Sequence, residues 1–340
     1  MHFKTNSVFI IAELSANHGD DIKIAVETVR AAKRAGADAI KLQTYTAETI
    51  TLNSDKDDFV IKGTIWEGKK LYDLYKGAFL PWEWHKELYK TAEEEGLVCF
   101  SSPFDKTAVD FLEELNTPIY KIASFEITDV NLIAYAASKQ KPMILSTGIA
   151  EYEDIELAVK TCREVGNNDI TLLKCTSSYP APIEEANLLM MQRFAKDFGV
   201  RVGLSDHTLG TIVPIVATAL GAQIIEKHFI LDRSIGGADA SFSLDEKEFT
   251  EMVTAVRNVE KAMGRESYEL TEKQKAGKAF ARSLYVAEDI KAGEIITEDN
   301  VRSVRPGFGL HPKYLKEILG KKVKIDLEMG TPLKLDDVEF

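Results

Sequence analysis

The chain has 340 residues, 45% of them hydrophobic and 28% charged, with a formal net charge of −12. Its size suits one large domain plus a small one, and its acidic balance argues against nucleic-acid or anionic-membrane partners, which bind basic surfaces. The apolar run before Glu13 is too short for a signal-peptide core or a membrane span, so we expect a cytoplasmic protein. The cysteines form no CxxC pair, which suits reduced and mostly buried thiols with a structural role: Cys99, Cys162 and Cys175.

Along residues 8–264, short β-branched runs alternate with amphipathic helical segments. Eight runs predict strands, each ending in a polar residue: 8–13, 38–43, 97–102, 118–124, 142–147, 170–177, 201–205 and 223–228. Glycines such as Gly36 and Gly96 mark the ends of predicted helices, and the last helix begins with a capping-box spacing from Asp245 to Glu248. The pattern indicates eight βα units in series.

Eight such units favour an α/β fold of the (β/α)₈ TIM-barrel type, because continuous apolar strands between helices are typical of a parallel sheet buried on both faces. An open doubly wound sheet is the alternative fold, and the lack of a glycine-rich dinucleotide loop after any strand argues against it. We expect a barrel domain at 1–264, a polar linker at 265–281 and a small domain at 282–340.

The predicted small domain contains a weak internal repeat. DIKAGEIITEDNV (289–301) and DLEMGTPLKLDDV (326–338) share one frame of aspartate, apolar, glycine and valine positions, which suggests pseudo-symmetry. Between the copies, Arg305 lies in the loop VRPGFGLHP, where an arginine is by default a surface charge. In the barrel, segment 44–80 is longer than a plain βα loop, and long loops there tend to form lids or specificity walls.

In a barrel, the carboxyl ends of all strands meet at one mouth. A single polar residue at a strand end is usually a helix cap or turn former, whereas eight together indicate an active site. The eight are Glu13, Gln43, Ser102, Ser124, Thr147, Ser177, Ser205 and His228.

His207 and His228 end the adjacent predicted strands seven and eight. Two neutral imidazoles suit a divalent ion such as Mn²⁺, Fe²⁺, Co²⁺ or Zn²⁺, and Glu13, on strand one beside strand eight, could supply or position an oxygen ligand. The alternative is that both histidines are hydrogen-bonded structural groups.

Lys41 and Lys121 lie near strand ends in apolar surroundings, where each ammonium needs an anionic partner. Salt bridges to Glu13 or Glu126 would meet that need. The hydroxyls around the mouth suggest instead a bound oxyanion carrying a phosphate and a carboxylate. Those hydroxyls belong to Ser102, Ser124, Ser146, Thr147, Ser177 and Ser205.

An ordered series of motifs resembles the sialic acid synthase family from about residue 8 to the end of the chain. The motifs are IAELSANH (11–18), KLQTY (41–45), SSPFD (101–105), KIASFE (121–126), STG (146–148), KCTSSYPAP (174–182), GLSDHTLG (203–210) and EKHF (226–229). These enzymes join a (β/α)₈ barrel to a small C-terminal antifreeze-like (SAF) domain. IAELSANH, QTYT, SSPFD and ASFE look like the branch that makes pseudaminic acid.

The resemblance implies roles for individual residues. It implies a metal site at His207 and His228, with Mn²⁺ expected and Mg²⁺ or Co²⁺ as alternatives. It implies a phosphoenolpyruvate site at Lys41, Ser102, Lys121, Ser124, Ser146, Ser177 and Ser205. It places Glu13, Gln43 and Glu126 at the reacting centre, and Tyr179, Asp239 and Arg305 at the sugar. The GGADASFSL context of Asp239 departs from the glycine-proline-aspartate frame of the family. Arg305 would come from the partner subunit, which implies a domain-swapped homodimer.

The implied reaction condenses phosphoenolpyruvate with an open-chain 2,4-diacetamido-2,4,6-trideoxy hexose of the altrose type, giving pseudaminic acid and phosphate. Glu13 is the candidate for proton transfer, with Glu126 and Glu226 left open. The alternatives are an N-acetylneuraminic or legionaminic acid synthase, another phosphoenolpyruvate-condensing or aldolase barrel, and a non-catalytic sugar-binding barrel.

Overall fold

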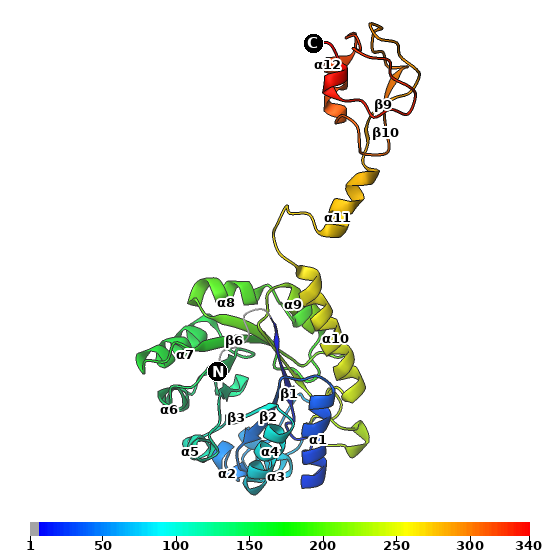
Figure 1. Ribbon diagram of the computed structural model, residues 1–340. Coiled ribbons are helices and arrows are strands. Elements are labelled where there is room, and N and C mark those ends of the chain that lie inside the picture. Colours follow the sequence, from blue (N-terminus) through cyan, green and yellow to red (C-terminus); the bar gives the residue numbers. More distant parts are fainter. Residues whose placement is uncertain (1–6) are drawn as a thin grey trace. The chain divides into compact units, whose positions relative to one another are not determined.

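The computed structural model describes residues 7–340, and the chain divides into two compact units, with the boundary in the sequence between Gly264 and Arg265. In the first unit a closed parallel barrel runs in the order β1 to β8, with β1 paired to both β2 and β8 (Figure 1). The (β/α)₈ prediction is therefore confirmed. The strands are β1 Phe9–Glu13, β2 Ala39–Thr44, β3 Val98–Pro103, β4 Tyr120–Ile122, β5 Met143–Ser146, β6 Ile170–Cys175, β7 Arg201–Asp206 and β8 Ile224–His228.

Helices surround this barrel and follow its strands in chain order. They are α1 Ile22–Arg34, α2 Ala47–Ile50, α3 Leu71–Ala78, α4 Trp82–Glu94, α5 Lys106–Glu114, α6 Val130–Ser138, α7 Tyr152–Glu164, α8 Met190–Phe198, α9 Ile212–Ala219 and α10 Glu246–Met263. The capping box predicted at α10 is present, since Glu248 N donates to Asp245 and Asp245 N donates to Glu248, at 2.9 and 3.1 Å. Among the described residues, no helix is both long and apolar enough to cross a membrane.

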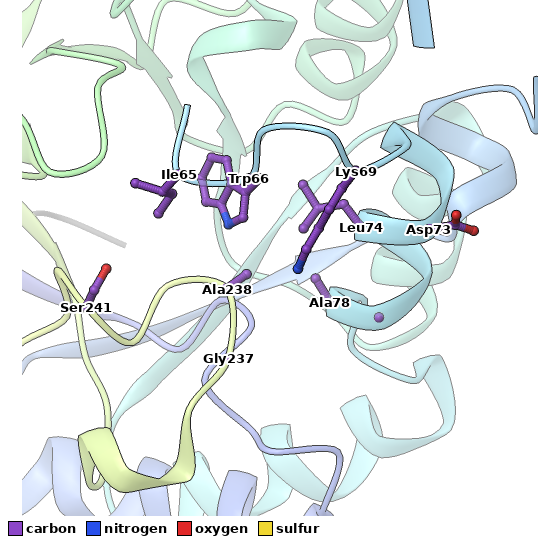
Figure 2. A pocket seen from close by; sticks show the side chains of 10 residues that line it. Ile65, Trp66, Lys69, Asp73, Leu74, Ala78, Gly237, Ala238 and Ser241 are labelled. Atoms are coloured by element: carbon purple, nitrogen blue, oxygen red, sulfur yellow. The ribbon is translucent and has the colours of Figure 1, made fainter. Parts of the chain in front are cut away.

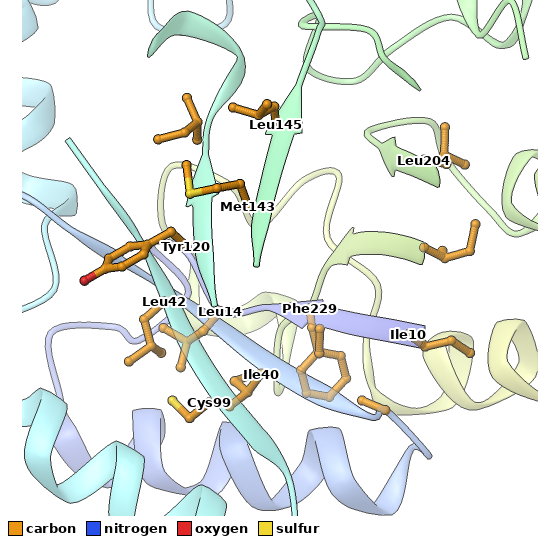
Figure 3. Packing of buried hydrophobic residues seen from close by; sticks show 14 of the residues in the cluster. Ile10, Leu14, Ile40, Leu42, Cys99, Tyr120, Met143, Leu145, Leu204 and Phe229 are labelled. Carbon is orange, nitrogen blue, oxygen red and sulfur yellow. The ribbon is translucent and has the colours of Figure 1, made fainter. Parts of the chain in front are cut away.

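Alternate residues of each strand face opposite sides of the barrel wall. Ile10, Ile40 and Leu42 point outward and pack, with Met143 and Leu145, in the core between barrel and helices (Figure 3). Inward positions on six strands, and the residue directly before β4, form a separate apolar cluster: Ile11, Ala39, Phe100, Ile119, Ile144, Leu173 and Ile224. Because both faces are buried, the strands are apolar throughout, which is why the sequence predicted them so well.

Two residues beyond each member of this apolar layer, the inward face becomes polar. The second layer consists of Glu13, Lys41, Ser102, Lys121, Ser146, Cys175 and Glu226, all of them buried. The barrel interior is thus stacked, with an apolar plug below and a charged layer above it at the carboxyl ends of the strands.

The second unit contains α11 Glu272–Gly277, β9 Ser283–Val286, β10 Val301–Val304 and α12 Leu315–Ile318, so a short helix lies within the segment expected to be a linker. Its two repeat copies interlock. Ile290 and Leu327 exchange backbone hydrogen bonds of 2.9 and 2.8 Å. Asp289 accepts from the N–H of Met329, and Asp326 accepts from the N–H of Ala292, in equivalent positions of the two copies. The expected pseudo-symmetry is present.

Gly203 occupies the inward position of β7 in the apolar layer, and a side chain there would not fit. A Cβ would lie 2.5 Å from the Ile224 carbonyl oxygen and 2.8 Å from a Leu173 methyl carbon. We predict that Gly203→Ala destabilises the barrel by about 1–3 kcal/mol through overpacking. Urea unfolding followed by tryptophan fluorescence measures this unit alone, because Trp66, Trp82 and Trp84 all belong to it.

Gly77 provides the matched control, since it lies in α3 of the same unit and a Cβ there would meet no atom within 4 Å. Gly77→Ala should leave stability unchanged or raise it by about 0.5–1 kcal/mol, because alanine loses less backbone entropy in a helix. Equal stability of the two variants would contradict the packing argument.

Candidate active site

Two lysines and two glutamates share the charged layer of the barrel. Lys41 is ion-paired with Glu13 and lies 3.5 Å from Glu226, while Lys121 donates to Glu226 at 3.0 Å. Ser205 donates a further hydrogen bond of 2.9 Å to Glu226. The salt-bridge alternative considered for the lysines is thus present at Glu13. Glu226 is the second partner, in place of Glu126.

The two carboxylates respond differently to this burial. For Glu226, burial favours the neutral acid, but Lys121 and Lys41 outweigh it and lower its pKa to about 2. For Glu13, burial prevails over the attraction of Lys41, and its pKa is raised. Glu226 therefore remains the permanent counter-ion of the lysines, and Glu13 is the carboxylate that takes up a proton more readily.

Hydroxyl groups surround these lysines. Ser102 accepts from Lys41 at 3.4 Å, and Ser124 accepts from the N–H of Gly148 at 3.0 Å. Within the described part of the chain, the buried hydroxyl of Ser146 and the Oε2 atom of Glu226 have no hydrogen-bond partner. Unsatisfied buried polar groups are costly. The Ser146 hydroxyl and the two ammonium groups can donate to a ligand rich in oxygen, whereas the Glu226 carboxylate can only accept.

Gly148 lets two of the hydroxyls converge, because a Cβ at this position would clash with the side chains of Ser177 and Ser124. Thr147 was expected at the mouth, but its hydroxyl makes a structural hydrogen bond. It donates to the carbonyl of Leu173 at 3.0 Å.

His207 and His228 lie side by side, with ring centroids 5.3 Å apart. His207 Nδ1 is 3.0 Å from the carbonyl oxygen of Thr176, so Nδ1 carries a proton and Nε2 is the nitrogen left for a metal. Burial lowers the pKa of this ring, but the neighbouring Cys175 outweighs burial and raises the pKa. Burial and the neighbouring His207 hold the pKa of His228 well below its usual range, so this ring is neutral. Its buried Nδ1 has no hydrogen-bond partner among residues 7–340.

Two adjacent imidazoles fit a divalent cation, which each ring binds through an unprotonated nitrogen. No group of three or more His, Cys, Asp or Glu side chains is arranged for a metal in the described residues, so water or substrate would complete the coordination shell. Asp239 is the carboxylate beside the pair, 3.7 Å from His228 Nδ1. Of the three buried cysteines, Cys175 also lies here, 3.8 Å from His207 Nδ1.

Further polar groups line the mouth above the charged layer. Gln43 donates to Glu13 and to Ser15, both at 3.0 Å, and Ser15 donates to Asp239 at 2.5 Å. Burial raises the pKa of Asp239. Asp239 thus reaches the site despite its unusual sequence context.

Glu126 lies in the single 3₁₀ turn Ser124–Glu126 after β4. Burial raises its pKa to about 7, and its Oε2 atom has no hydrogen-bond partner within residues 7–340. The Tyr179 ring packs 4.5 Å from His207 and 5.8 Å from Trp66, measured between ring centroids.

These mouth groups face one cavity of about 400 Å³. Its lining includes Ser15, Gln43, Ser124, Glu126, Ser177, Tyr179, His228 and Asp239. A second cavity of about 760 Å³ lies between the 65–78 segment and the loop at 237–241, and it contains none of the predicted site residues (Figure 2). The 400 Å³ cavity, which the predicted site residues line, is therefore the candidate active site.

The barrel brings together every predicted site residue except Arg305, which belongs to the second unit. Sequence reasoning missed Ser15, whose φ of +48° turns its side chain between Gln43 and Asp239. It also missed the pair Asp206 and Lys227, which lies behind the two histidines on β7 and β8. Lys227 Nζ is 2.5 Å from Asp206 and 2.6 Å from the carbonyl of Thr208. The Lys227 side chain is 0% exposed and the Asp206 side chain is 2% exposed.

Replacing Lys227 by methionine would leave the buried Asp206 carboxylate unpaired. We predict that Lys227→Met destabilises the barrel by about 3–5 kcal/mol, because the remaining charge keeps its desolvation cost. Adding Asp206→Asn should recover most of the loss, since the amide oxygen can still accept from Thr208 N, now 3.0 Å from Asp206. Tryptophan-monitored urea unfolding measures both variants, and an equal loss in the single and double variants would contradict the pairing.

The chain is similar to known proteins over nearly its whole length. The NeuB family model matches residues 28–268, and the SAF domain model matches residues 281–339. A pseudaminic acid synthase of Campylobacter jejuni is 52% identical over 337 residues, covering 99% of this chain and 98% of that protein. An N,N′-diacetyllegionaminic acid synthase of Legionella pneumophila is 35% identical, and the match covers 97% of this chain and 94% of that protein.

Among solved structures, an N-acetylneuraminic acid synthetase from Leptospira borgpetersenii, in complex with citrate, is 32% identical. Its TM-score is 0.71, and the match covers 80% of this chain and 90% of that one. The length and strength of these matches, together with the barrel and its charged layer, show that the chain belongs to the NeuB family.

Proposed function

We propose that this protein is a pseudaminic acid synthase, which condenses phosphoenolpyruvate with 2,4-diacetamido-2,4,6-trideoxy-altrose to give pseudaminic acid and phosphate. The observation that carries the chemistry is the buried pair of lysines, with the unpartnered Ser146 hydroxyl, in the same barrel mouth as the adjacent His207 and His228. The 52% identity to the Campylobacter jejuni enzyme supports this acceptor over those of the legionaminic and N-acetylneuraminic acid enzymes, which are less similar.

Phosphoenolpyruvate is held in this proposal by Lys41 and Lys121 and by five serine hydroxyls. Its phosphate and carboxylate bring the strong acceptors that ammonium and hydroxyl donors require. The unpartnered hydroxyl of Ser146 supports a ligand at this level, and Gly148 allows the hydroxyls of Ser124 and Ser177 to approach each other. The serines are Ser102, Ser124, Ser146, Ser177 and Ser205.

His207 and His228 would hold a divalent ion, for which we propose Mn²⁺, with Mg²⁺ and Co²⁺ as alternatives. When bound, such an ion supplies Lewis-acid polarisation of a carbonyl oxygen. The chain prepares the site by fixing the His207 tautomer through the Thr176 carbonyl and by keeping His228 neutral.

The remaining groups orient the sugar and manage protons. The methylene carbon of phosphoenolpyruvate forms a bond to the aldehyde carbon of the open-chain sugar, and the aldehyde oxygen takes up a proton to become a hydroxyl. Water then adds to the former enol carbon and gives up a proton, and phosphate leaves as the bond from this carbon to the phosphate oxygen breaks. Glu13, whose pKa is raised by burial, accepts the proton of that water in this scheme. Gln43 orients Glu13 through its 3.0 Å hydrogen bond, and Glu126, Tyr179 and Asp239 face the sugar.

The 282–340 domain contributes Arg305 to the same chemistry in a domain-swapped homodimer, with 265–281 as the linker. Among residues 7–340, no arginine lines the 400 Å³ cavity, and no carboxylate pairs with the exposed Arg305. An arginine from a second copy would supply a further cation for the acidic substrates. The three free cysteines fit a cytoplasmic location, as does a phosphoenolpyruvate substrate.

The acceptor is tested by measuring phosphate release from phosphoenolpyruvate with Mn²⁺ present. The acceptors compared are 2,4-diacetamido-2,4,6-trideoxy-altrose, its mannose-configured isomer and N-acetylmannosamine. We expect release with the altrose sugar. Release with only one of the others would retain the condensation chemistry and overturn the acceptor, and binding without any release would favour a sugar-binding barrel.

Removing either imidazole should abolish turnover without unfolding the barrel. We predict that His207→Ala and His228→Ala each lower kcat by on the order of 1000-fold, since Lewis-acid catalysis is worth several kcal/mol. Chelation of the wild-type enzyme should have the same effect, and Mn²⁺ should restore activity in the wild type alone. Circular dichroism checks folding, and turnover that survives both substitution and chelation would refute the metal site.

A further inference from the structure

The 400 Å³ cavity has two unlike walls. Strand ends and the loops after them supply its polar floor, which includes Gln43, Glu126 and Asp239. The opposite wall comes from the segment 45–78, here called the roof, whose lining side chains carry no charge. The roof residues are Tyr45, Ile50, Ile61, Thr64, Trp66, Leu71, Leu74, Tyr75 and Ala78.

Backbone pairing fixes the roof in place. Ile61 N donates to the carbonyl of Lys69, and Gly68 N donates to the carbonyl of Ile61, both at 2.9 Å, so the turn between them presents Trp66. Leu74 follows within α3, and the Tyr45 ring packs edge-on against Tyr75 at 5.8 Å. The apolar side chains of the roof are therefore held by local structure rather than by a ligand.

A line of aromatic rings connects the roof to the candidate metal ligands. Trp66 lies 5.8 Å from Tyr179, and Tyr179 lies 4.5 Å from His207, between ring centroids. In the proposed function the aldehyde lies at His207 and His228, and we place the rest of the sugar along Tyr179. Its far end, the carbon most distant from the aldehyde, meets the roof.

Trp66 and Leu74 also separate this cavity from its larger neighbour. Both residues, together with Ala78 and Ala238, line the 400 Å³ and the 760 Å³ cavities. Figure 2 shows the Trp66 indole pointing from its turn toward the loop that carries Ala238. The indole and Leu74 thus close the site where the far end of the sugar would lie.

We infer that Trp66 and Leu74 select the acceptor by its deoxygenated end. This inference rests on the proposed function. The methyl group of a 6-deoxy sugar packs against the two side chains. A hydroxyl at the same carbon would lose its hydrogen bonds to water and find no partner on this apolar surface. An apolar pocket rejects an added hydroxyl by roughly 100-fold at most, so discrimination should lie in the range of about 10- to 100-fold.

The test compares two acceptors that differ only at the terminal carbon: 2,4-diacetamido-2,4,6-trideoxy-altrose and 2,4-diacetamido-2,4-dideoxy-altrose. The readout is the ratio of their kcat/KM values for phosphate release. The wild type should favour the 6-deoxy sugar by about 10- to 100-fold. In Leu74→Asn, a similar volume offers an amide to the hydroxyl, and the ratio should fall about tenfold while the KM for phosphoenolpyruvate is unchanged.

Two further variants separate selection from general damage. Trp66→Ala joins the two cavities and should also lower the ratio, whereas Leu74→Met keeps an apolar surface of similar size and should retain it. Lys69→Ala is the matched control, because Lys69 lines only the larger cavity and its backbone pairing with Ile61 survives the change. Its ratio should equal that of the wild type.

The outcomes distinguish this inference from the proposed function. A wild type that uses both sugars equally well, or Leu74→Asn and Trp66→Ala variants with the wild-type ratio, would overturn the role of the roof and leave the pseudaminic acid synthase proposal intact. A wild type that releases no phosphate with either altrose sugar would overturn both.

Discussion

Two buried lysines need anionic partners in the middle of the barrel, and much of the site follows from that need. Each lies two residues beyond an apolar plug residue on its own strand, so strand alternation directs it inward, away from bulk water. An unpaired ammonium in this position would be very costly. Glu13 on β1 and Glu226 on β8 form ion pairs with the two lysines. With all four groups ionised the layer has no net charge. An anionic substrate therefore competes with these ion pairs for the ammonium groups, and Glu13 is the carboxylate whose pKa burial raises.

The fold was predictable from the sequence because its signal is local and repeated eight times. Strands buried on both faces are apolar throughout, and their polar ends mark the mouth. The histidines were predictable for the same reason, since adjacent strands in a closed barrel bring their ends together. Glu226 as the partner of Lys121 was not predictable, because 105 residues separate them and only the diameter of the barrel sets their distance.

The other site residues that the sequence did not predict lie in irregular segments. Trp66 lies in a turn without helical or strand periodicity, and its contact with Tyr179 depends on how two long loops meet. Ser15 adopts a left-handed backbone that no sequence pattern indicates for a serine. The sequence predicts that segment 44–80 forms a wall or lid; which of its residues face the cavity is a property of the folded loop.

The interlocked repeats of the second unit have a different consequence. Asp289 of the first copy caps the backbone of the second, Asp326 of the second caps the backbone of the first, and the apolar residues of both share one core. Each copy thus supplies part of the backbone hydrogen bonding and part of the apolar core of the other. The two copies should therefore unfold together, as the subunits of an obligate homodimer do, although here they belong to one chain.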